Sequence, residues 1–222
     1  MSAGTAIVRC VYGVRGGGKS TLARHLVAND ARVIAFDPQR DYQGEAWRVA
    51  TTRSEIIAAL KSEGLSRFRI SYCFDTGTTD PVSEMVWLAD VIAHLQKKYR
   101  SDGIGLSLVV DEAHEAFPNR PLSKDEGPLR RLVMQGRHLG VGLTVVTQRP
   151  ANISTMIRSQ ATEVYALALS RRDDRVAAAD LREGAAPAVA SLSGYDFVKI
   201  TPQGHSVCRL SLETGEIRAI TQ

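Results

Sequence analysis

Eight residues near the amino terminus have the types and the spacing that hold a phosphate group. Residues 13–20 read GVRGGGKS and fit G-x-x-x-x-G-K-[ST], the Walker A pattern. Glycines let consecutive backbone N–H groups approach an anion, and the lysine brings a compact positive charge to the outer phosphates. The sequence therefore predicts a P-loop for ATP. Its expected binding residues are Gly13, Arg15, Gly16, Gly17, Gly18, Lys19, Ser20 and Thr21.

Two adjacent acids follow an apolar stretch in the middle of the chain. Residues 106–110 read LSLVV, which is typical of a buried strand, and Asp111 and Glu112 come directly after them. Ligand sites of α/β folds form at the carboxyl ends of strands, so we expect this pair beside the P-loop. The Walker B pattern predicts that Asp111 and the Ser20 hydroxyl hold Mg²⁺. Glu112 is the expected catalytic base, which takes a proton from, or orients, the attacking water.

A glutamine ends the next apolar stretch. Residues 142–147 read GLTVVT and are followed by Gln148. A side-chain amide at a strand end can bond both an attacking water and a terminal phosphate. We therefore expect Gln148 to act as a catalytic sensor that distinguishes ATP from ADP, alongside Lys19 and Glu112.

Alternating strand and helix patterns place these residues in an α/β fold. Apolar runs predict strands at residues 6–12, 32–36, 68–74, 106–110, 142–147 and 163–169. Helices are expected at 20–29, 54–63, from 81 onward, and at 129–139, 152–160 and 173–182. Ser54, Asp80 and Asn152 are the expected amino-terminal caps of three of them. We expect one domain over residues 1–222, with a motor core at about 6–170 and edge strands at about 195–222.

Bulk composition narrows the class of protein. The formal charge is +4 with 28 basic and 24 acidic residues, and the pI is about 9.1, which is weak support for a nucleic-acid partner. No apolar run is long enough for a membrane span, and no signal pattern begins the chain. The three cysteines have neither disulfide nor metal spacing, so we expect buried thiols in a reducing cytoplasm.

The three motifs together resemble the HerA–FtsK superfamily of P-loop ATPases. Residues 13–21, VVDEAH at 109–114 and GRHLGVGLTVVTQRP at 136–150 carry this resemblance, which spans roughly residues 6–169. It implies a RecA-like (ASCE) core whose mainly parallel sheet has strand order 5-1-4-3-2, flanked by helices. It also implies an arginine finger that acts on a neighbouring subunit. Arg137 is the first candidate, and Arg158 and Arg149 are weaker ones.

Within this superfamily, the chain resembles the compact members that contain only the motor. These members are similar to the genome-packaging ATPases of membrane-containing icosahedral viruses. That resemblance implies a double-stranded DNA translocase working as a homo-oligomeric ring, a hexamer or pentamer, in the host cytoplasm or with the virion. It also implies a capsid or membrane vertex protein as partner. DNA contact is expected through basic loops such as residues 120–131. The alternative within the superfamily is a HerA- or FtsK-like ATPase for pumping plasmid or chromosomal DNA, or for conjugation.

Two other functional classes remain open from the motifs. One is a nucleotide-gated assembly module, in which hydrolysis only times an interaction. The other is a small-molecule P-loop kinase, which the Asp-Glu pair and the strand-end glutamine disfavour. DEAH-box helicases share the Asp-Glu-Ala-His string but need two RecA-like domains, for which this chain is too short. His114, in that string, either couples the acidic pair to the loop behind it or only begins a helix.

Overall fold

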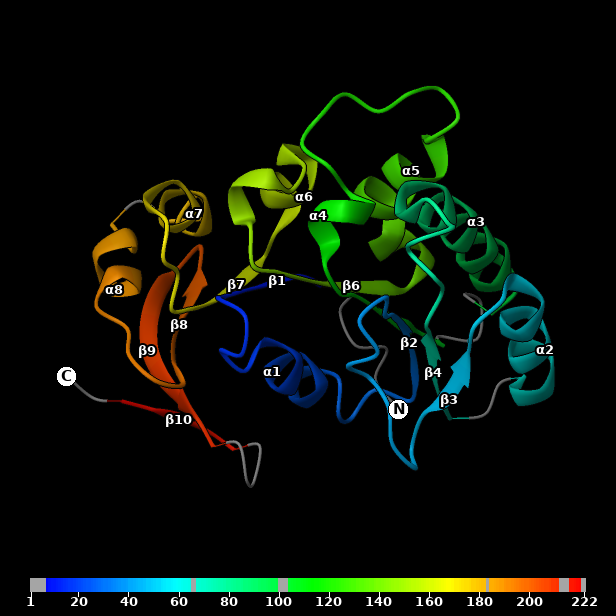
Figure 1. The fold of residues 1–222 in the computed structure, drawn as a ribbon, viewed down its shortest axis with the longest axis horizontal. Helices are drawn as coiled ribbons and strands as arrows, with labels where there is room; N and C mark the ends of the chain where they lie inside the picture. The colour runs from blue at the N-terminus through cyan, green and yellow to red at the C-terminus, as the bar shows by residue number, and fades with distance from the viewer. Residues whose placement is uncertain (1–6, 65–66, 100–103, 183, 212–215, 221–222) are drawn as a thin grey trace.

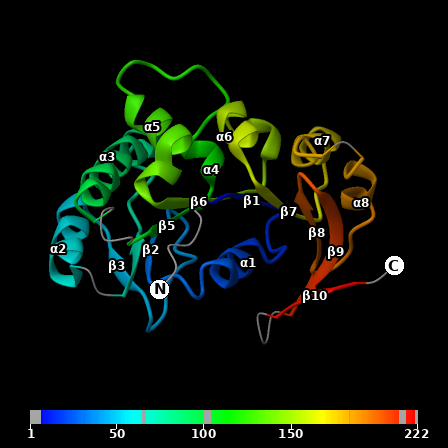
Figure 2. The same ribbon diagram turned by 180° about the vertical axis from the view of Figure 1, so that it is seen from behind.

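A ten-stranded sheet organises the chain (Figures 1 and 2). The computed structural model describes residues 7–64, 67–99, 104–182, 184–211 and 216–220. The sheet order is β10-β9-β8-β7-β1-β6-β5-β2-β4-β3. Its centre is parallel and one edge is antiparallel, so the chain forms the mixed α/β architecture that the sequence predicts.

Five parallel strands form the centre of the sheet. In spatial order they are β7 (Glu163–Leu167), β1 (Val8–Tyr12), β6 (Val141–Thr147), β5 (Leu106–Val110) and β2 (Arg32–Phe36). Numbered along the core, this is the expected order 5-1-4-3-2. All five strands end at the same edge of the sheet, which brings the P-loop, the acidic pair and Gln148 to neighbouring positions.

Both edges of the sheet extend beyond this core. β4 (Phe68–Tyr72) pairs in parallel with β2, and β3 (Arg48–Ala50) pairs in parallel with β4. At the opposite edge, β8 (Asp196–Thr201), β9 (Gly204–Leu210) and β10 (Ile217–Ala219) add an antiparallel meander to β7. The expected carboxyl-terminal edge strands are therefore confirmed.

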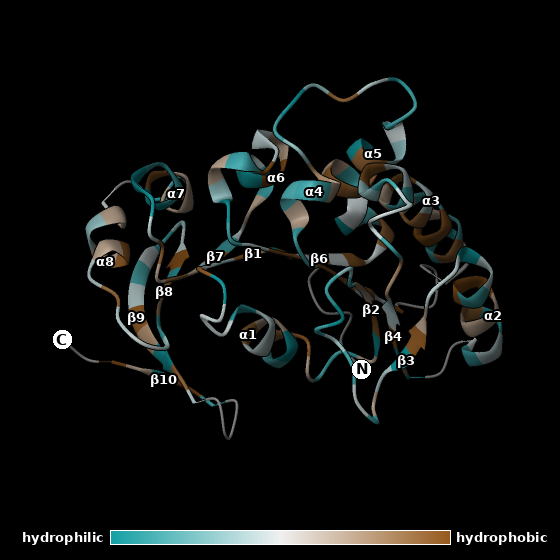
Figure 3. Ribbon diagram, viewed as in Figure 1, coloured by the Kyte–Doolittle hydropathy of each residue, from teal (hydrophilic) through white to brown (hydrophobic). Residues whose placement is uncertain are grey.

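Alternate residues of the central strands bury opposite faces of the sheet. On one face, Val11 and its neighbours pack against Leu22 and Ala23 of α1 (Lys19–Leu26). On the other, Cys10 and its neighbours pack under a larger helical layer. That layer contains α2 (Arg53–Glu63), α3 (Pro81–Tyr99), α4 (Ala113–Ala116), α5 (Gly127–Gln135) and α6 (Thr155–Gln160). Figure 3 shows the strands mainly in hydrophobic colours and the loop before α5 mainly in hydrophilic ones.

Short elements complete the helical layers. The 3-10 helices η2 (Gly136–Leu139) and η3 (Pro150–Asn152) flank β6. Near the antiparallel edge, α7 (Arg172–Ala178) and α8 (Ala186–Ala190) lie beside β8 and β9 (Figure 1). The helix expected at 129–139 thus ends as an α-helix at Gln135, and Gly140 then reverses the chain with a φ of 71°.

Helix caps confirm one expectation and correct two. Asp80 accepts a hydrogen bond from the Ser83 N–H at 2.9 Å, as expected. Thr52, rather than Ser54, caps α2 by accepting from Glu55 N, and Ser154, rather than Asn152, caps α6 by accepting from Met156 N. Both working caps sit where the chain is still extended, which lets the side-chain oxygen face the first-turn N–H groups.

The three cysteines are buried free thiols. Burial raises the pKa of the Cys10 thiol to about 12, so this thiol stays protonated and packs as an apolar group. Within the described residues, no helix is both long and apolar enough to span a bilayer.

Candidate functional site

The P-loop joins the end of β1 to the start of α1. Gly13 N–H and Val14 N–H donate to the carbonyls of Thr147 and Ala168, which ties the loop to β6 and to the chain after β7. A Cβ at Gly13 would lie 2.9 Å from the Leu167 Cβ, so only glycine fits there. Gly18 directly precedes α1 and has a φ of 91°. Residues with a side chain rarely adopt this backbone conformation.

Lys19 and Ser20 turn their polar atoms toward the same region. Lys19 is 8% exposed and its Nζ donates to the Val14 carbonyl at 3.1 Å, which folds the ammonium back over its own loop. The Ser20 hydroxyl donates to Asp41 Oδ2 at 2.6 Å. Both groups stand at the amino terminus of α1, where the helix dipole favours an anion.

Asp111 brings a buried carboxylate to the end of β5. Its Oδ1 accepts from the Glu112 N–H at 2.9 Å, whereas its Oδ2 is buried and has no hydrogen-bond partner among the described residues. Burial raises the pKa of this carboxyl to about 7, and the negative charges of Asp41, Glu112 and Asp37 add to that effect. An orphaned buried carboxylate oxygen is costly unless a cation or a donor reaches it.

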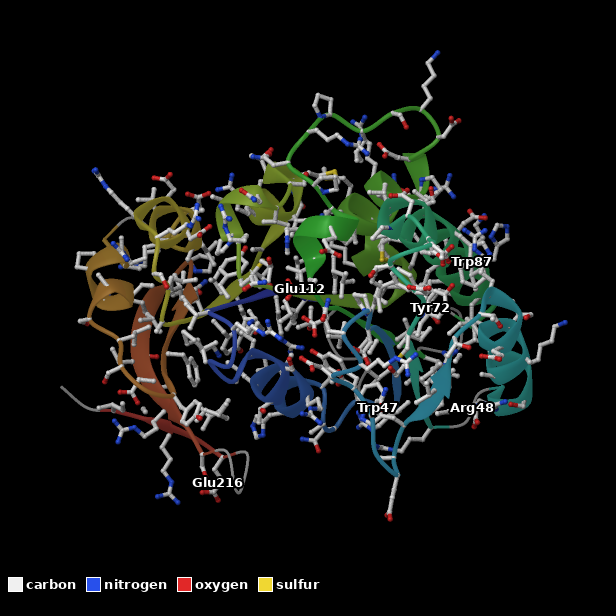
Figure 4. The ribbon with its side chains drawn as sticks, viewed as in Figure 1. Trp47, Arg48, Tyr72, Trp87, Glu112 and Glu216 are labelled. Carbon is white, nitrogen blue, oxygen red and sulfur yellow. The ribbon has the colours of Figure 1, made fainter. Side chains whose placement is uncertain are left out.

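Glu112 stands at the turn from β5 into α4, with a left-handed backbone (φ 43°, ψ 45°). Gln148 Nε2 donates to Glu112 Oε1 at 3.3 Å, and His114 Nδ1 lies 3.4 Å from Glu112 Oε2. The same His114 nitrogen is 3.0 Å from the Thr147 hydroxyl. Figure 4 shows Glu112 near the middle of the molecule, below α4. Of the two interpretations of His114, the geometry therefore favours the one in which this residue is coupled to the acidic pair.

A cavity of about 660 Å³ joins these groups. Among the expected residues, Gly13 and Gly17 belong to the loop but do not line the cavity. The lining residues are Arg15, Gly16, Gly18, Lys19, Ser20, Thr21, Arg24, Gln39, Asp41, Asp111, Glu112, His114, Glu115, Gln148 and Tyr195. One side of the cavity is thus the P-loop, and the acidic pair with Gln148 forms another.

Three arginines were expected as possible fingers, and the structure separates them. Arg149 Nε lies 3.3 Å from Asp174 Oδ2, and Arg158 is paired with Asp180. Arg137 is exposed in η2, with no ion pair recorded for it in the described part of the chain. It precedes β6, whereas Gln148 follows β6, and a strand of 7 residues separates them by about 20 Å. Arg137 therefore lies near the amino-terminal end of β6, whereas its own cavity lies at the carboxyl-terminal end.

The basic loop before α5 is partly committed to internal contacts. Arg120 donates to both Glu126 carboxylate oxygens, at 2.9 and 2.6 Å. These hydrogen bonds lower the pKa of Glu126 to about 2. Arg131 makes a long ion pair of 3.9 Å with Asp90, whereas Lys124 and Arg130 are exposed. Arg120 thus braces its own loop, and DNA contact through residues 120–131 stays a prediction.

Sequence reasoning missed five lining residues: Arg24, Gln39, Asp41, Glu115 and Tyr195. Asp41 follows β2, and an acid shortly after a core strand is a signal that could have been used. Tyr195 precedes β8 and reaches the cavity because β8 pairs with β7 next to β1. No local pattern around Tyr195 indicates this position, because it depends on the pairing of distant strands.

The fold and the site define a P-loop NTPase of the HerA–FtsK type. The chain aligns over 100% of its length, and 98% of that of the other chain, with the genome-packaging NTPase B204 of Sulfolobus turreted icosahedral virus 2 in complex with ATP-gammaS, at a TM-score of 0.68 and 17% identity. VirB4 of Thermoanaerobacter pseudethanolicus aligns over 91% of this chain and 89% of its own at a TM-score of 0.58 and 13% identity. At these identities the likeness establishes the fold.

Sequence comparison identifies the family. The chain belongs to the zonular occludens toxin (Zot) family, whose pattern matches residues 55–174, more than half of the chain. The chain is also similar to the DNA double-strand break repair helicase HerA of Pyrococcus furiosus, with 31% identity over 71 residues. That stretch is 32% of this chain and only 13% of HerA. The HerA–FtsK resemblance read from the motifs is confirmed.

Proposed function

We propose that this protein is an ATP-hydrolysing motor that moves double-stranded DNA, working as a homo-oligomeric ring in viral genome packaging. The observation that carries the proposal is the single cavity in which Lys19 and Ser20 stand opposite Asp111, Glu112 and Gln148. Support for the setting comes from the fold shared with B204 over the whole chain. Each role below follows from the chemistry of a named side chain.

The P-loop would bind the phosphates of ATP. Its backbone N–H groups and the α1 amino terminus provide donors for the phosphate oxygens, and Lys19 adds a positive charge. Lys19 Nζ now bonds the Val14 carbonyl, a contact that a phosphate can replace because the lysine side chain is long and flexible. Arg15 and Thr21 border the same space.

A magnesium ion fits the acidic side of the cavity. The unpartnered Asp111 Oδ2 and the Ser20 hydroxyl are both hard oxygen ligands, and Mg²⁺ usually takes one or two protein groups together with phosphates and waters. The described residues hold no group of three or more His, Cys, Asp or Glu side chains that would trap a metal alone. Ser20 and Asp111 would hold Mg²⁺ together with the nucleotide, and the bound ion would neutralise phosphate charge.

Glu112 would activate the water that attacks the terminal phosphate. Its carboxylate is 16% exposed at the cavity wall, where Gln148 and His114 border its two oxygens. Its Oε2 has no hydrogen-bond partner among the described residues, so this oxygen can accept a hydrogen bond from the water without breaking another one. Gln148 can release Glu112 and bond the terminal phosphate, which makes the amide a sensor of that phosphate.

Arg137 would complete the site of a neighbouring subunit. Its position at the opposite edge of the sheet excludes a role in its own cavity, and its exposure leaves the guanidinium available. An arginine supplied in trans contributes about 10³–10⁵ in rate to other NTPases. A ring arrangement would give every subunit such a neighbour.

DNA would contact exposed basic residues of the loop before α5 and of α5 itself, such as Lys124 and Arg130. Contacts with phosphate are independent of sequence and weaken with salt. The likeness to VirB4 and HerA leaves conjugation, or the pumping of plasmid or chromosomal DNA, as the alternative setting. A double-jelly-roll capsid gene beside this gene would favour packaging, with a capsid or membrane vertex protein as partner, and a set of conjugation genes would favour the alternative.

The motor proposal is tested by hydrolysis and by DNA movement. We expect DNA to stimulate ATPase activity at low salt and at ring-forming protein concentrations. Glu112→Gln should keep ATP binding but lose about 10²–10⁴ in turnover, together with displacement of a triplex-forming strand from DNA. Lys19→Ala should lose binding as well.

Contrary outcomes separate the functional classes. An ATPase rate that DNA does not change would contradict the motor. A Glu112→Gln variant that stays locked on one protein partner and still supports one round of function would favour a nucleotide-gated assembly module.

A further inference from the structure

Asp41 makes a contact with the P-loop that the proposed roles do not use. The Ser20 hydroxyl donates to Asp41 Oδ2 at 2.6 Å, the length of a charge-assisted O–H···O⁻ hydrogen bond. A hydroxyl has one hydrogen and two lone pairs. Because the hydrogen of Ser20 is directed to Asp41, only the lone pairs of the oxygen remain for another partner, and lone pairs are what a cation needs.

The loop that carries Asp41 is built around a buried carboxylate. Asp37, at the end of β2, is 0% exposed. Its oxygens accept from Asp41 N at 2.7 Å, Tyr42 N at 2.9 Å and the Ser71 hydroxyl at 2.7 Å. These bonds satisfy the buried charge and at the same time fix the backbone on either side of the Asp41 side chain.

The same loop contains a strained residue and an aromatic anchor. Arg40 has a φ of 62°, which costs free energy in a residue with a side chain. Tyr42 is 0% exposed, and its ring packs edge-on against Trp47 at 5.6 Å between centroids. Asp41 itself is exposed, so water competes for its oxygens and the contact with Ser20 depends on this rigid loop.

Two aspartates share the cavity with Ser20, alongside the cationic side chains of Arg15, Lys19 and Arg24. Asp41 and Asp111 both border the cavity, and Asp111 is 3% exposed with Oδ2 unpartnered among the described residues. Two carboxylates near one hydroxyl repel each other and attract a divalent cation. An arrangement that costs free energy in the folded chain is expected where a ligand offsets that cost.

We propose that Asp41 is a positioning residue for Mg²⁺, which holds the Ser20 hydroxyl with its lone pairs free and adds negative charge behind it. The inference rests on the proposed binding of Mg²⁺ and nucleotide. Groups that orient a metal ligand from behind typically affect metal affinity by about 10–100-fold. Asp41 acts through Ser20 and does not itself touch the nucleotide.

Equilibrium binding of a fluorescent, non-hydrolysable ATP analogue at increasing Mg²⁺ concentration tests this role without relying on turnover. Asp41→Ala should raise the Mg²⁺ concentration at half-saturation by about 10–100-fold. Binding of the analogue in EDTA should be unchanged or tighter, because a negative charge has been removed. Asp41→Asn keeps a hydrogen-bond acceptor but not the charge, so its Mg²⁺ concentration at half-saturation should lie between those of the wild type and Asp41→Ala. Glu45→Ala removes another exposed acid of the same loop and should match the wild type.

A double-mutant cycle decides whether Asp41 works through Ser20. Ser20→Ala combined with Asp41→Ala should cost little more than Ser20→Ala alone, because the contact is already lost. Additive effects, or a half-saturation in Asp41→Ala equal to that of the wild type, would overturn the inference while leaving the proposed function intact. If binding of the analogue to the wild-type protein does not depend on Mg²⁺, that result would contradict the proposed metal site itself. Melting temperatures within a few degrees of the wild type would show that each variant is folded.

Discussion

Glu112 and Arg40 are the two non-glycine residues with positive φ in the described part of the chain. Glu112 lines the cavity, and Arg40 directly precedes Asp41, which also lines it. A left-handed backbone costs of order 1–3 kcal/mol for such residues and persists only where the surroundings enforce it. The strain is therefore located where the chain must aim a carboxylate at one small space.

Asp111 also lowers the stability of the folded state, here because a carboxylate charge is buried. Its pKa is raised from an ordinary value of 3.8 to about 7, so the folded state holds this proton more tightly than the unfolded state. The resulting stability is fully present below about pH 4 and is lost as the pH rises toward 7. At pH 8 the folded protein carries the whole penalty of a buried charge.

Asp111→Asn is accordingly expected to stabilise protein purified free of nucleotide. The free energy of unfolding should rise by about 1–3 kcal/mol at pH 8 and change little at pH 4, while ATP turnover falls. Urea unfolding at the two pH values measures the difference, and Asp75→Asn serves as an exposed control. A destabilised Asp111→Asn at pH 8 would show that the carboxylate is better satisfied than the geometry indicates.

The motif residues could be placed from the sequence because each has a fixed chemical partner. The P-loop that leads to Lys19 follows the end of β1, Asp111 follows β5 and Gln148 follows β6, and parallel strands end together. Asp41 and Tyr195 were missed because their places depend on a loop built around Asp37 and on the pairing of β8 with β7. The strand pairing is a long-range contact that leaves no periodic trace near Tyr195, whereas the position of Asp41 shortly after β2 was a local signal that was not used.

At the scale of single elements, strand positions were predicted better than helix ends. A buried strand is a continuous apolar run, whereas a cap is one polar residue among several. Thr52 and Ser54 are both cap formers two residues apart, and the extended backbone at Thr52 decides between them. The change from α5 to η2 at Gly136 follows from the turn that brings the chain into β6, which helical spacing alone does not reveal.

The loop before α5 depends on one ion pair. Hydrogen bonds from Arg120 lower the pKa of Glu126 from an ordinary value of 4.5 to about 2. A lowered acid pKa contributes stability that is present above about pH 4.5 and is lost as the pH falls toward 2. Glu126 also accepts from the Ser123 N–H at 2.7 Å, so the carboxylate holds the loop at two points.

Glu126→Gln should therefore loosen this loop at pH 7, and the difference from the wild type should narrow as the pH falls toward 3. Backbone hydrogen exchange over residues 118–127 reports the change, with faster exchange expected in the variant. Asp125→Asn, a change of the neighbouring exposed acid, is the control. Equal exchange in Glu126→Gln and the wild type at pH 7 would mean that the pair does not hold the loop.

At the scale of the molecule, the strand order could be predicted because one family motif set implies one core topology. The addition of β4 and β3 beyond β2 could not, since a short strand such as Arg48–Ala50 can join either edge of a sheet. Placing Arg137 and Gln148 at opposite ends of β6 is a consequence of this topology. Arg137 therefore lies away from its own cavity, which is why its proposed role is in a neighbouring copy.

Mixing two inactive variants tests that consequence. Arg137→Ala should lower ATPase activity by about 10³ or more, and Lys19→Ala should abolish binding in its own pocket. A one-to-one mixture should recover activity in about a quarter of sites, because intact pockets then meet neighbours with an intact arginine. Arg172→Ala, which removes another exposed arginine, should hydrolyse ATP as the wild type does without being mixed with a second variant. A mixture as inactive as its components would contradict the role of Arg137 in trans.

Tyr195 belongs to the segment after residue 170, which contains none of the signature motifs, yet its ring borders the cavity. A protein truncated near residue 170 would still contain every motif but would lack Tyr195 at the cavity. It would also leave the outer edge of β7 unpaired, a template for aggregation. Shortened versions of this protein should therefore keep β10, the last strand of the meander, and not end after the last recognisable motif.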